Sequence, residues 1–406
     1  MIGAWSFSAE QTLCRADLAV PCEIIKNSCK EMNIATRRPV ALFIPSLSWG
    51  GMERMAIHLA TGLAKEGFAI DIVLMRKRTP DFEPLELPGT VNVISLEADR
   101  GLQAIPALAR YLRSCEPLAL MAISTPLCVS AFAGNLLSRR KVPCICRQVS
   151  TFSKMFAGYK GYNRWLTPWI ARPVLRRSHV IAISRGVAED LIQNVGVDRS
   201  RIRVLYNPTI APDFLGRLEE DVKLPELEVA QGPTVVAVGR LVAAKGFDVL
   251  IRALALVRTT VAANLVILGE GPERANLEAL IKSLGLENSV RLPGYQRNTL
   301  PIVKRADVFA MSSRWEGFGN VLVEALYTGV PVVATDCPHG PREILDGGRF
   351  GTLVPVDDPV AMAAGIRRAL NGEEQIDRDA RDEWLGQFTV ENAVKEFVRY
   401  LEHVVK

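Results

Sequence analysis

Two glutamates in one short stretch could hold the two ends of a long polar ligand. Glu316 and Glu324 lie eight positions apart and flank the segment Gly317-Phe318-Gly319-Asn320-Val321, whose glycines permit a close backbone approach. A helical pattern begins near Asn320, where free N–H groups favour an anion. Eight helical residues span at most ~12 Å. The two carboxylates could therefore grip opposite ends of a ligand whose middle is a phosphate.

Two cations after another apolar run could hold that phosphate. Arg240 and Lys245 follow the run at 234–238, from which Gly239 separates them. Cations five residues apart at the end of a strand can straddle a diphosphate, Arg through a bidentate fork and Lys as a point charge. A solvated basic turn is the alternative interpretation. Tyr295 could stack on a base, with an exposed loop tyrosine as its alternative.

The elements that must position these residues alternate between strand and helix. In the first half, strand-like runs lie at 40–45, 69–75, 91–96, 118–124, 142–147, 179–184 and 202–206, and helical patterns near 52–65, 102–113, 126–137, 165–177 and 186–194. The second half repeats the alternation from 234 to 371, before a final amphipathic helix near 390–404. Near-continuous apolar strands between helices indicate parallel sheets covered on both faces. We therefore expect an α/β fold with two Rossmann-like, doubly wound domains facing each other across a cleft.

An acidic segment with prolines and little periodicity, from Asp213 to Pro233, is the best domain boundary. We expect an N-terminal extension, a first domain, a linker, a second domain and a C-terminal helix that packs back on the first domain, at 1–38, 39–213, 214–233, 234–388 and 389–406. Residues 1–31 lack the pattern of a signal peptide and precede Met32. We expect them to be poorly ordered or to reflect an early start-site assignment.

Composition excludes several classes of protein. The hydrophobic share of 49% is normal for a globular chain, and the net charge of +5 is modest, which argues against nucleic-acid binding. Eight cysteines without a Cys-x-x-Cys pair indicate reduced thiols in a cytoplasmic protein. No run of 18 or more apolar residues occurs, so we expect no spanning helix. A dehydrogenase would need a Gly-x-Gly-x-x-Gly motif after its first strand, which is missing.

Together the motifs resemble those of retaining glycosyltransferases with the GT-B architecture, in particular family four (glycosyltransferase group 1). Glu316 and Glu324 match the Glu-x7-Glu signature, and the resemblance extends from about residue 39 onward through Gly50-Gly51-Met52-Glu53, the Gly239–Gly246 segment, Gly269-Glu270-Gly271 and Thr335–Leu345. It implies that Arg240 and Lys245 bind the diphosphate of a nucleotide-sugar donor, that Glu316 holds sugar hydroxyls and that Glu324 accepts both ribose hydroxyls. Further donor-binding residues would be Gly51, Gly239, Tyr295, Phe318, Gly319, Asn320 and Val321.

The resemblance also implies the reaction. It is that of members that build lipid-linked or cell-surface glycans, so we expect a hexose or N-acetylhexosamine to pass with retention from a UDP-linked donor to a lipid-linked or polysaccharide-precursor acceptor. The first domain would bind the acceptor and the second the donor. No Asp-x-Asp motif follows a strand, so we expect no metal or other cofactor. A soluble transferase for a small sugar phosphate or metabolite, and a non-catalytic nucleotide-sugar-binding protein, are the alternatives.

Two features bear on the acceptor side. Many members carry a donor-sugar histidine near the strand at 142–147, where this chain has Cys146-Arg147-Gln148; Arg147 is the candidate substitute. The stretch 152–177 combines Lys and Arg with Tyr and Trp, a composition suited to anionic headgroups. We expect peripheral contact with the cytoplasmic face of the membrane.

Overall fold

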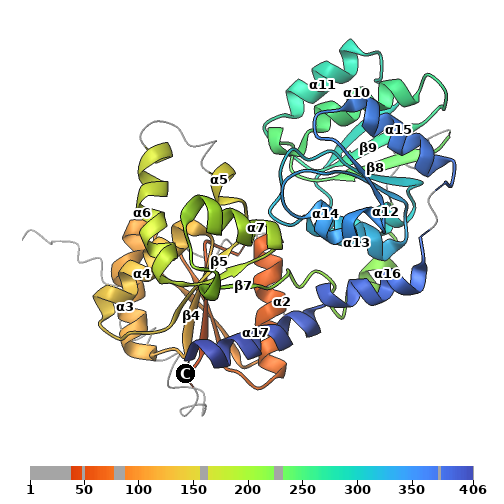
Figure 1. Ribbon diagram of the computed structural model, residues 1–406. Helices are drawn as coiled ribbons and strands as arrows, with labels where there is room; N and C mark the ends of the chain where they lie inside the picture. The colour runs from red at the N-terminus through yellow and green to blue at the C-terminus, as the bar shows by residue number, and fades with distance from the viewer. Residues whose placement is uncertain are drawn as a thin grey trace, which may run out of the picture. The chain divides into compact units, whose positions relative to one another are not determined.

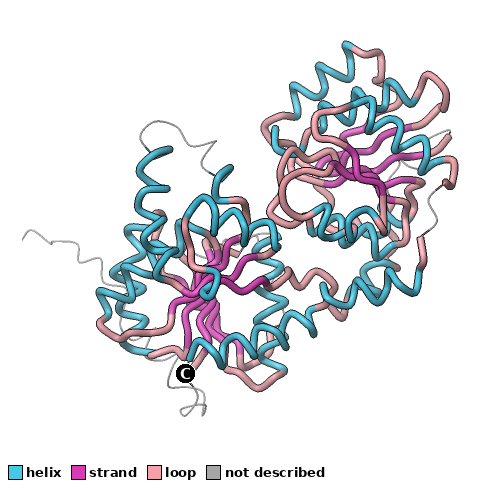
Figure 2. Tube along the Cα trace, in the orientation of Figure 1, coloured by secondary structure: helices cyan, strands magenta, loops and turns pink. Residues whose placement is uncertain are grey.

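The computed structural model describes residues 38–47, 51–76, 87–155, 163–223, 232–373 and 376–405. Except for Arg38, the N-terminal extension expected at 1–38 lies outside these residues, as does Gly50. The α/β class expected from the sequence is confirmed: the described chain contains two parallel sheets with helices packed on them (Figures 1 and 2).

The first domain is built on a seven-stranded parallel sheet in the order β3-β2-β1-β4-β5-β6-β7. Its strands are β1 (Val40–Ile44), β2 (Ile70–Leu74), β3 (Val91–Ser95), β4 (Ala119–Ile123), β5 (Cys144–Gln148), β6 (His179–Ala182) and β7 (Ile202–Val204). Its helices are α2 (Gly51–Lys65), α3 (Gly101–Cys115), α4 (Thr125–Ser138), α5 (Phe152–Met155), α6 (Asn163–Arg177) and α7 (Arg185–Asp190). The strand order reverses between β1 and β4, which is where doubly wound sheets bind ligands.

The second domain repeats this plan on a six-stranded parallel sheet in the order β10-β9-β8-β11-β12-β13. The strands are β8 (Thr234–Val238), β9 (Asn264–Leu268), β10 (Val290–Gly294), β11 (Val308–Met311), β12 (Val332–Thr335) and β13 (Thr352–Val354). The helices are α10 (Phe247–Val257), α11 (Arg274–Ser283), α12 (Leu300–Lys304), α13 (Asn320–Thr328), α14 (Pro341–Ile344) and α15 (Pro359–Leu370). The switch point lies between β8 and β11, the strands that precede the Arg240 and Glu316 loops.

The strands are apolar at nearly every position because both faces of each sheet are covered. In β1, Ala41 and Phe43 belong to one buried cluster while Val40, Leu42 and Ile44 belong to another on the opposite face. Alternate side chains of a strand point to opposite faces, so a strand covered on both sides needs apolar residues throughout.

The last helix, α17 (Val390–Val405), packs on the first domain although it follows the second in sequence (Figure 1). Its apolar face, including Val394, Phe397 and Leu401, joins the cluster formed by β1 and α2. Gly62 of α2 permits the approach, because a Cβ there would collide with Val394. The hydrophobic periodicity that predicts this helix is therefore its packing face.

Short helices were missed in the sequence. Helix α8 (Phe214–Leu218) lies inside the segment expected to be a linker, and α16 (Arg378–Leu385) precedes α17. Phe214 is buried and packs edge-on against Tyr327 at 4.6 Å between ring centroids. Helices of five and eight residues contribute too few positions for a period of 3.6 to show.

Candidate functional site

Two loops of the second domain meet at the switch point between β8 and β11. The 239–246 loop follows β8 and the 312–319 loop follows β11. Ser312 Oγ donates to the carbonyl oxygen of Lys245 at 2.9 Å. Gly246 has φ of +59°, and a Cβ there would collide with the carbonyl oxygen of Ser312. Only glycine combines that conformation with so close an approach, so the two loops are held as one unit.

Arg314 fastens the same loops, a role that sequence reasoning missed. Its guanidinium binds both carboxylate oxygens of Asp248 at 3.0 and 2.8 Å and one oxygen of Asp357 at 2.6 Å. Burial opposes ionisation of Asp248, but the bonds to Arg314 outweigh it and hold the pKa of this carboxyl below its ordinary value. An arginine between two aspartates far apart in sequence gives no local signal.

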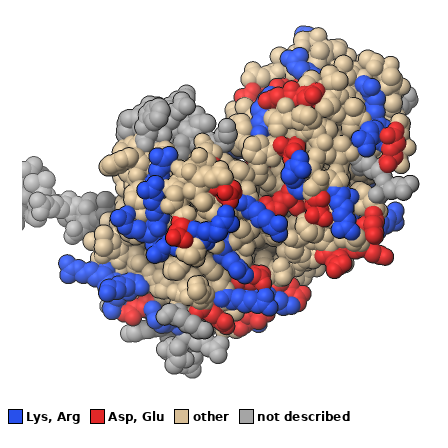
Figure 3. Space-filling model, in the orientation of Figure 1, with Lys and Arg blue, Asp and Glu red and all other residues tan. Residues whose placement is uncertain are grey.

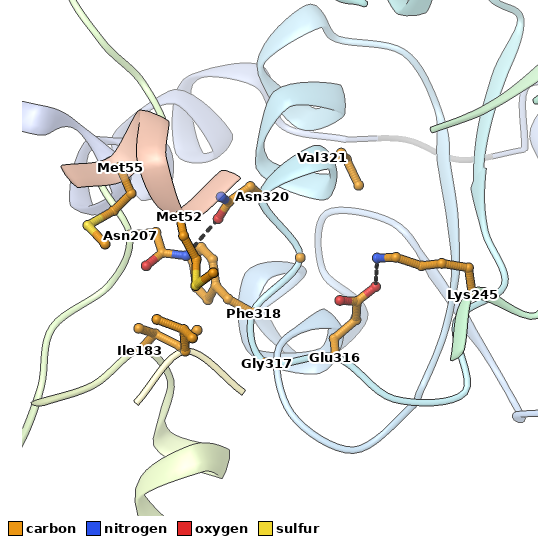
Figure 4. Close-up of a pocket in the computed structure, with 12 residues that line it drawn as sticks. Met52, Met55, Ile183, Asn207, Lys245, Glu316, Gly317, Phe318, Asn320 and Val321 are labelled. Atoms are coloured by element: carbon orange, nitrogen blue, oxygen red, sulfur yellow. Dashed lines mark hydrogen bonds and ion pairs between the residues drawn. The ribbon is translucent and has the colours of Figure 1, made fainter. Parts of the chain in front are cut away.

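Lys245 and Glu316 form an ion pair on the wall of a pocket of about 300 Å³ (Figure 4). The Lys245 Nζ to Glu316 Oε1 distance is 2.5 Å, and Ser313 Oγ donates to the same carboxylate oxygen at 2.7 Å. Phe318, Gly319, Asn320 and Val321, all predicted from the sequence, line this pocket too, together with Met52, Met55, Val149, Ile183, Asn207 and Gly317.

The pocket loop is also bound by the first domain. Thr151 Oγ1 donates to the carbonyl oxygen of Glu316 at 3.1 Å, and Ser184 Oγ donates to that of Gly317 at 3.0 Å. A Cβ on Gly317 would collide with the carbonyl oxygen of Val149. This glycine is therefore required for contact with the loop after β5, and not for ligand approach alone.

The other predicted residues do not line this pocket. Arg240 is exposed and its side chain has no partner among the described residues, Gly239 packs on Phe247 and Lys245, and Gly51 begins α2. Tyr295, just after β10, is 54% exposed. Gly239 and Arg240 directly follow β8, as Tyr295 follows β10.

Glu324 lies on α13 with only 12% of its side chain exposed. Its nearest cation is Arg54 of α2, with Nη1 3.7 Å from Oε1. Burial raises the pKa of Glu324, while the charges of Arg54 and Arg217 act in the opposite direction. Burying a carboxylate without a close ion-pair partner destabilises the folded state. A buried carboxylate of this kind therefore indicates a functional role.

Arg147 does not reach the pocket wall. It is 2% exposed, and its Nη2 donates to the carbonyl oxygens of Leu205 and Tyr206 at 3.3 and 3.4 Å and to Asn207 Oδ1 at 3.0 Å. Burial lowers its pKa to about 10, which leaves it protonated at neutral pH. A direct contact with a ligand in place of histidine has no support in this geometry.

A second cavity of about 520 Å³ lies beside α14 and the start of α7. Glu343, on its wall, accepts hydrogen bonds from the backbone N–H of Arg185 at 2.9 and 3.0 Å and from Tyr206 OH at 2.6 Å. Burial, with the neighbouring carboxylate, raises the pKa of Tyr206. Glu343 thus joins α14 to the first domain.

The chemistry of the pocket is that of an anion and polyol site. One lysine, a helix start with free N–H groups and a carboxylate suit phosphate oxygens and hydroxyl groups. Among the described residues, no group of three or more His, Cys, Asp or Glu side chains could hold a metal ion.

Both halves of the chain match known glycosyltransferase families. Residues 49–209 match Glycosyltransferase Family 4, and residues 220–383 match Glycosyl transferases group 1. These two segments contain every residue of the pocket wall.

Curated relatives match over most of the chain. It is 29% identical over 348 residues, 82% of its length and 91% of the relative's, to the N-acetylgalactosamine-N,N'-diacetylbacillosaminyl-diphospho-undecaprenol 4-alpha-N-acetylgalactosaminyltransferase of Campylobacter jejuni. It is 28% identical over 361 residues, covering 87% and 96% of the two chains, to the lipopolysaccharide core biosynthesis glycosyltransferase LpsE of Rhizobium meliloti.

Solved structures share the fold. Anabaena HepE, crystallised with UDP, superposes with a TM-score of 0.72 at 22% identity, covering 90% of this chain and all of that one. WaaG, a glycosyltransferase of lipopolysaccharide biosynthesis, gives a TM-score of 0.63 at 18% identity, with 88% and 95% covered. The two-domain GT-B architecture expected from the sequence is confirmed.

Proposed function

Because this chain carries the family 4 and group 1 domains of a GT-B glycosyltransferase, we propose that it transfers a hexose or N-acetylhexosamine, with retention, from a UDP-sugar to a lipid-linked glycan precursor. The observation that carries the proposal is the pocket at the β8–β11 switch point, where Lys245 and Glu316 meet the start of α13. The UDP in the Anabaena HepE structure supports uracil as the base of the donor.

The donor lies with its diphosphate at the start of α13 and its sugar beside Glu316. Lys245 has three N–H donors, so it can keep its bond to Glu316 and still bind a phosphate oxygen. Arg240, exposed and unpaired among the described residues, swings in as the second cation. Glu316 accepts from sugar hydroxyls, and Glu324 exchanges Arg54 for the ribose hydroxyls.

Transfer proceeds by attack of an acceptor hydroxyl on the face of the sugar that the diphosphate leaves. The C–O bond to the diphosphate breaks, the new C–O bond forms on the same face, and the acceptor proton passes to the departing phosphate oxygen. Negative charge grows on that phosphate, so Arg240, Lys245 and the helix N–H groups stabilise the transition state more than the bound donor. No metal is required for this stabilisation.

The acceptor is a glycan on a polyprenyl diphosphate or a related lipid, as the names of the Campylobacter and Rhizobium relatives suggest. Exposed apolar side chains on two packed helices, α4 and α6, support contact with a membrane: Leu136, Leu137, Leu166, Trp169 and Ile170. Exposed Arg139, Arg140, Arg172 and Arg177 lie on or next to the same helices, and Figure 3 shows basic side chains on this domain. None of the described helices has both the length and the apolarity to cross a membrane.

A transferase for a soluble acceptor is the second candidate, supported by the shared fold of a sucrose-phosphate synthase, with a TM-score of 0.70. Activity that is indifferent to lipid and detergent would favour it over the membrane-bound reaction.

Donor binding is tested by thermal unfolding in the presence of a panel of nucleotide sugars. A ligand at 100 times its Kd stabilises the folded state by about 2.7 kcal/mol, so UDP-sugars should raise the unfolding temperature by several degrees. The Glu324→Ala variant should lose most of that rise. No shift with any nucleotide sugar, in wild type and variant alike, would contradict the proposal.

A further inference from the structure

The buried Arg147 fixes the orientation of Asn207, a side chain that lines the pocket. Arg147 donates from Nη2 to Asn207 Oδ1 at 3.0 Å. A guanidinium has only donors, so Asn207 must turn its oxygen toward Arg147. Its Nδ2 group must then face the other way.

That Nδ2 group meets the first residue of α13. Asn207 Nδ2 donates to Asn320 Oδ1 at 2.8 Å (Figure 4), and Thr209 Oγ1 approaches the same oxygen at 3.5 Å. An amide nitrogen is a donor and not an acceptor, so Asn320 must present its oxygen to Asn207. Arg147 therefore orients the amide of Asn207, which in turn orients the amide of Asn320.

The atom left over is Asn320 Nδ2. It is accessible and has no hydrogen-bond partner among the described residues. Asn207 and Asn320 both line the pocket that holds Lys245 and Glu316. Had the amide of Asn320 the opposite orientation, an oxygen lone pair would take the place of these N–H groups and would repel an anion.

We propose that Arg147 and Asn207 are positioning residues that hold the Asn320 carboxamide with its N–H groups available to the donor diphosphate. This inference rests on the proposed function, since it requires a diphosphate at the start of α13. Neither Arg147 nor Asn207 need touch the reacting atoms. The buried cation at position 147 therefore acts on donor binding through two amides.

The hydrogen bonds from Arg147 through Asn207 to Asn320 form a relay. The substitution Asn207→Asp tests this relay while keeping the shape of the side chain. Aspartate pairs with Arg147, so the variant should unfold at or above the wild-type temperature. Its second oxygen can only accept, so Asn320 must reverse its amide and turn its oxygen toward the diphosphate. UDP, measured by titration calorimetry, should bind roughly 10-fold more weakly, the loss expected for a hydrogen bond to a charged group.

The same substitution also adds a negative charge, and a double-mutant cycle separates the two effects. Asn320→Ala removes the amide that the relay orients, so in that background Asn207→Asp should weaken UDP binding less than threefold. An equal loss in both backgrounds would show that charge alone is responsible and would overturn the inference. Unchanged UDP affinity in the single variant would overturn it as well.

A second variant keeps the test informative if Asn207→Asp fails to fold. Asn207→Ser adds no charge and is too short to reach Arg147 or Asn320, while Arg147 keeps its bonds to the carbonyl oxygens of Leu205 and Tyr206. It leaves the Asn320 amide without a fixed orientation, so it should weaken UDP binding by a smaller factor in the wild-type background and by none in Asn320→Ala. Titration of the wild-type protein with UDP distinguishes failure of the relay from failure of the donor assignment. If wild type binds UDP and the variants match it, only the relay is wrong; if wild type does not bind UDP, the donor assignment and the relay both fall.

Discussion

At the scale of single residues, the pocket is defined by one ion pair. Lys245 and Glu316 are joined at 2.5 Å on the pocket wall, and both come from loops held together by Gly246 and Arg314. A charge placed this way stabilises a developing anion without reorganising.

Replacing Lys245 should therefore affect the rate more than the fold. Lys245→Ala removes one cation from the leaving diphosphate, and we expect kcat to fall by roughly 10²–10³, as for loss of one donor in a preorganised anion site. Lys304→Ala is the matched control, because Lys304 also pairs with a glutamate, Glu219, at 2.8 Å but on the surface. Steady-state kinetics of both variants checks the prediction; an equal kcat for the two would contradict it.

Glu324 should destabilise the folded protein at neutral pH while it contributes to donor binding. Its pKa is raised in the folded state, so the folded protein holds this proton more tightly than the unfolded chain does. The stabilising contribution is full below the unfolded pKa and is lost as pH rises through the folded pKa. Glu324→Gln should therefore unfold at a higher temperature than wild type at pH 7.5 and bind UDP more weakly.

The pH dependence provides the control for that prediction. As the pH falls through the folded pKa of Glu324, wild type takes up the proton and the difference in unfolding temperature should shrink. Thermal unfolding of both proteins at pH 7.5 and at acidic pH measures it. A glutamine variant less stable than wild type at pH 7.5 would mean that the pairing with Arg54 outweighs burial.

At the scale of elements, the site depends on close contacts between loops. Gly317 is the clearest case, because its missing Cβ makes room for the carbonyl oxygen of Val149. Gly317→Ala must push the pocket loop away from the loop after β5, at a cost of about 1–3 kcal/mol for an overpacked contact.

Two measurements test this. Chemical denaturation of Gly317→Ala should show the loss of stability, and the KM for donor should rise. Gly216→Ala, in helix α8, has nothing within 4 Å of the added Cβ and should be at least as stable as wild type, because alanine favours helices. If the two variants behave alike, the contact with Val149 does not constrain the pocket loop.

Sequence patterns predicted the long elements closely and the site in part. The alternation of apolar strands with amphipathic helices predicts all thirteen strands of the two sheets, because burial on both faces requires it. The Glu316 to Val321 segment is continuous in sequence, so its chemistry shows locally. Arg54, Asn207 and Arg314 act across large sequence separations, and no spacing rule reveals such partners.

Arg147 shows a different limit. Its position near the end of β5 suggested a ligand contact, but the side chain turns inward to the loop after β7. A charged residue in a strand can face either side of the sheet. Sequence alone does not say whether carbonyl oxygens lie within hydrogen-bonding distance of its side chain.

At the scale of the whole molecule, the first domain carries the exposed apolar and basic surface on α4 and α6 and also contributes to the pocket wall. We propose that this surface contacts the membrane. Trp169, 74% exposed on α6, is the largest apolar side chain on that surface. Tryptophan prefers the headgroup region of a bilayer, and the arginines around it add attraction to anionic lipid.

Vesicle co-sedimentation tests this surface. Trp169→Ala combined with Arg172→Gln should bind vesicles containing anionic lipid several-fold more weakly than wild type, because each basic residue near the surface contributes about 1 kcal/mol. Val360→Ala, a 66% exposed apolar residue on α15, is the control and should bind like wild type. Wild-type binding that does not weaken at high salt would argue against the electrostatic part.

Retaining transfer from a UDP-sugar to a lipid-linked acceptor is tested most directly by a transfer reaction followed by NMR. Purified protein is incubated with UDP-linked hexoses and N-acetylhexosamines and with polyprenyl-diphosphate-linked glycans, while UDP release and the anomeric proton of the product are recorded. We predict acceptor-dependent UDP release and an α-linked product from an α-linked donor. A β-linked product, or no UDP release above the Lys245→Ala background with any pair, would contradict the account.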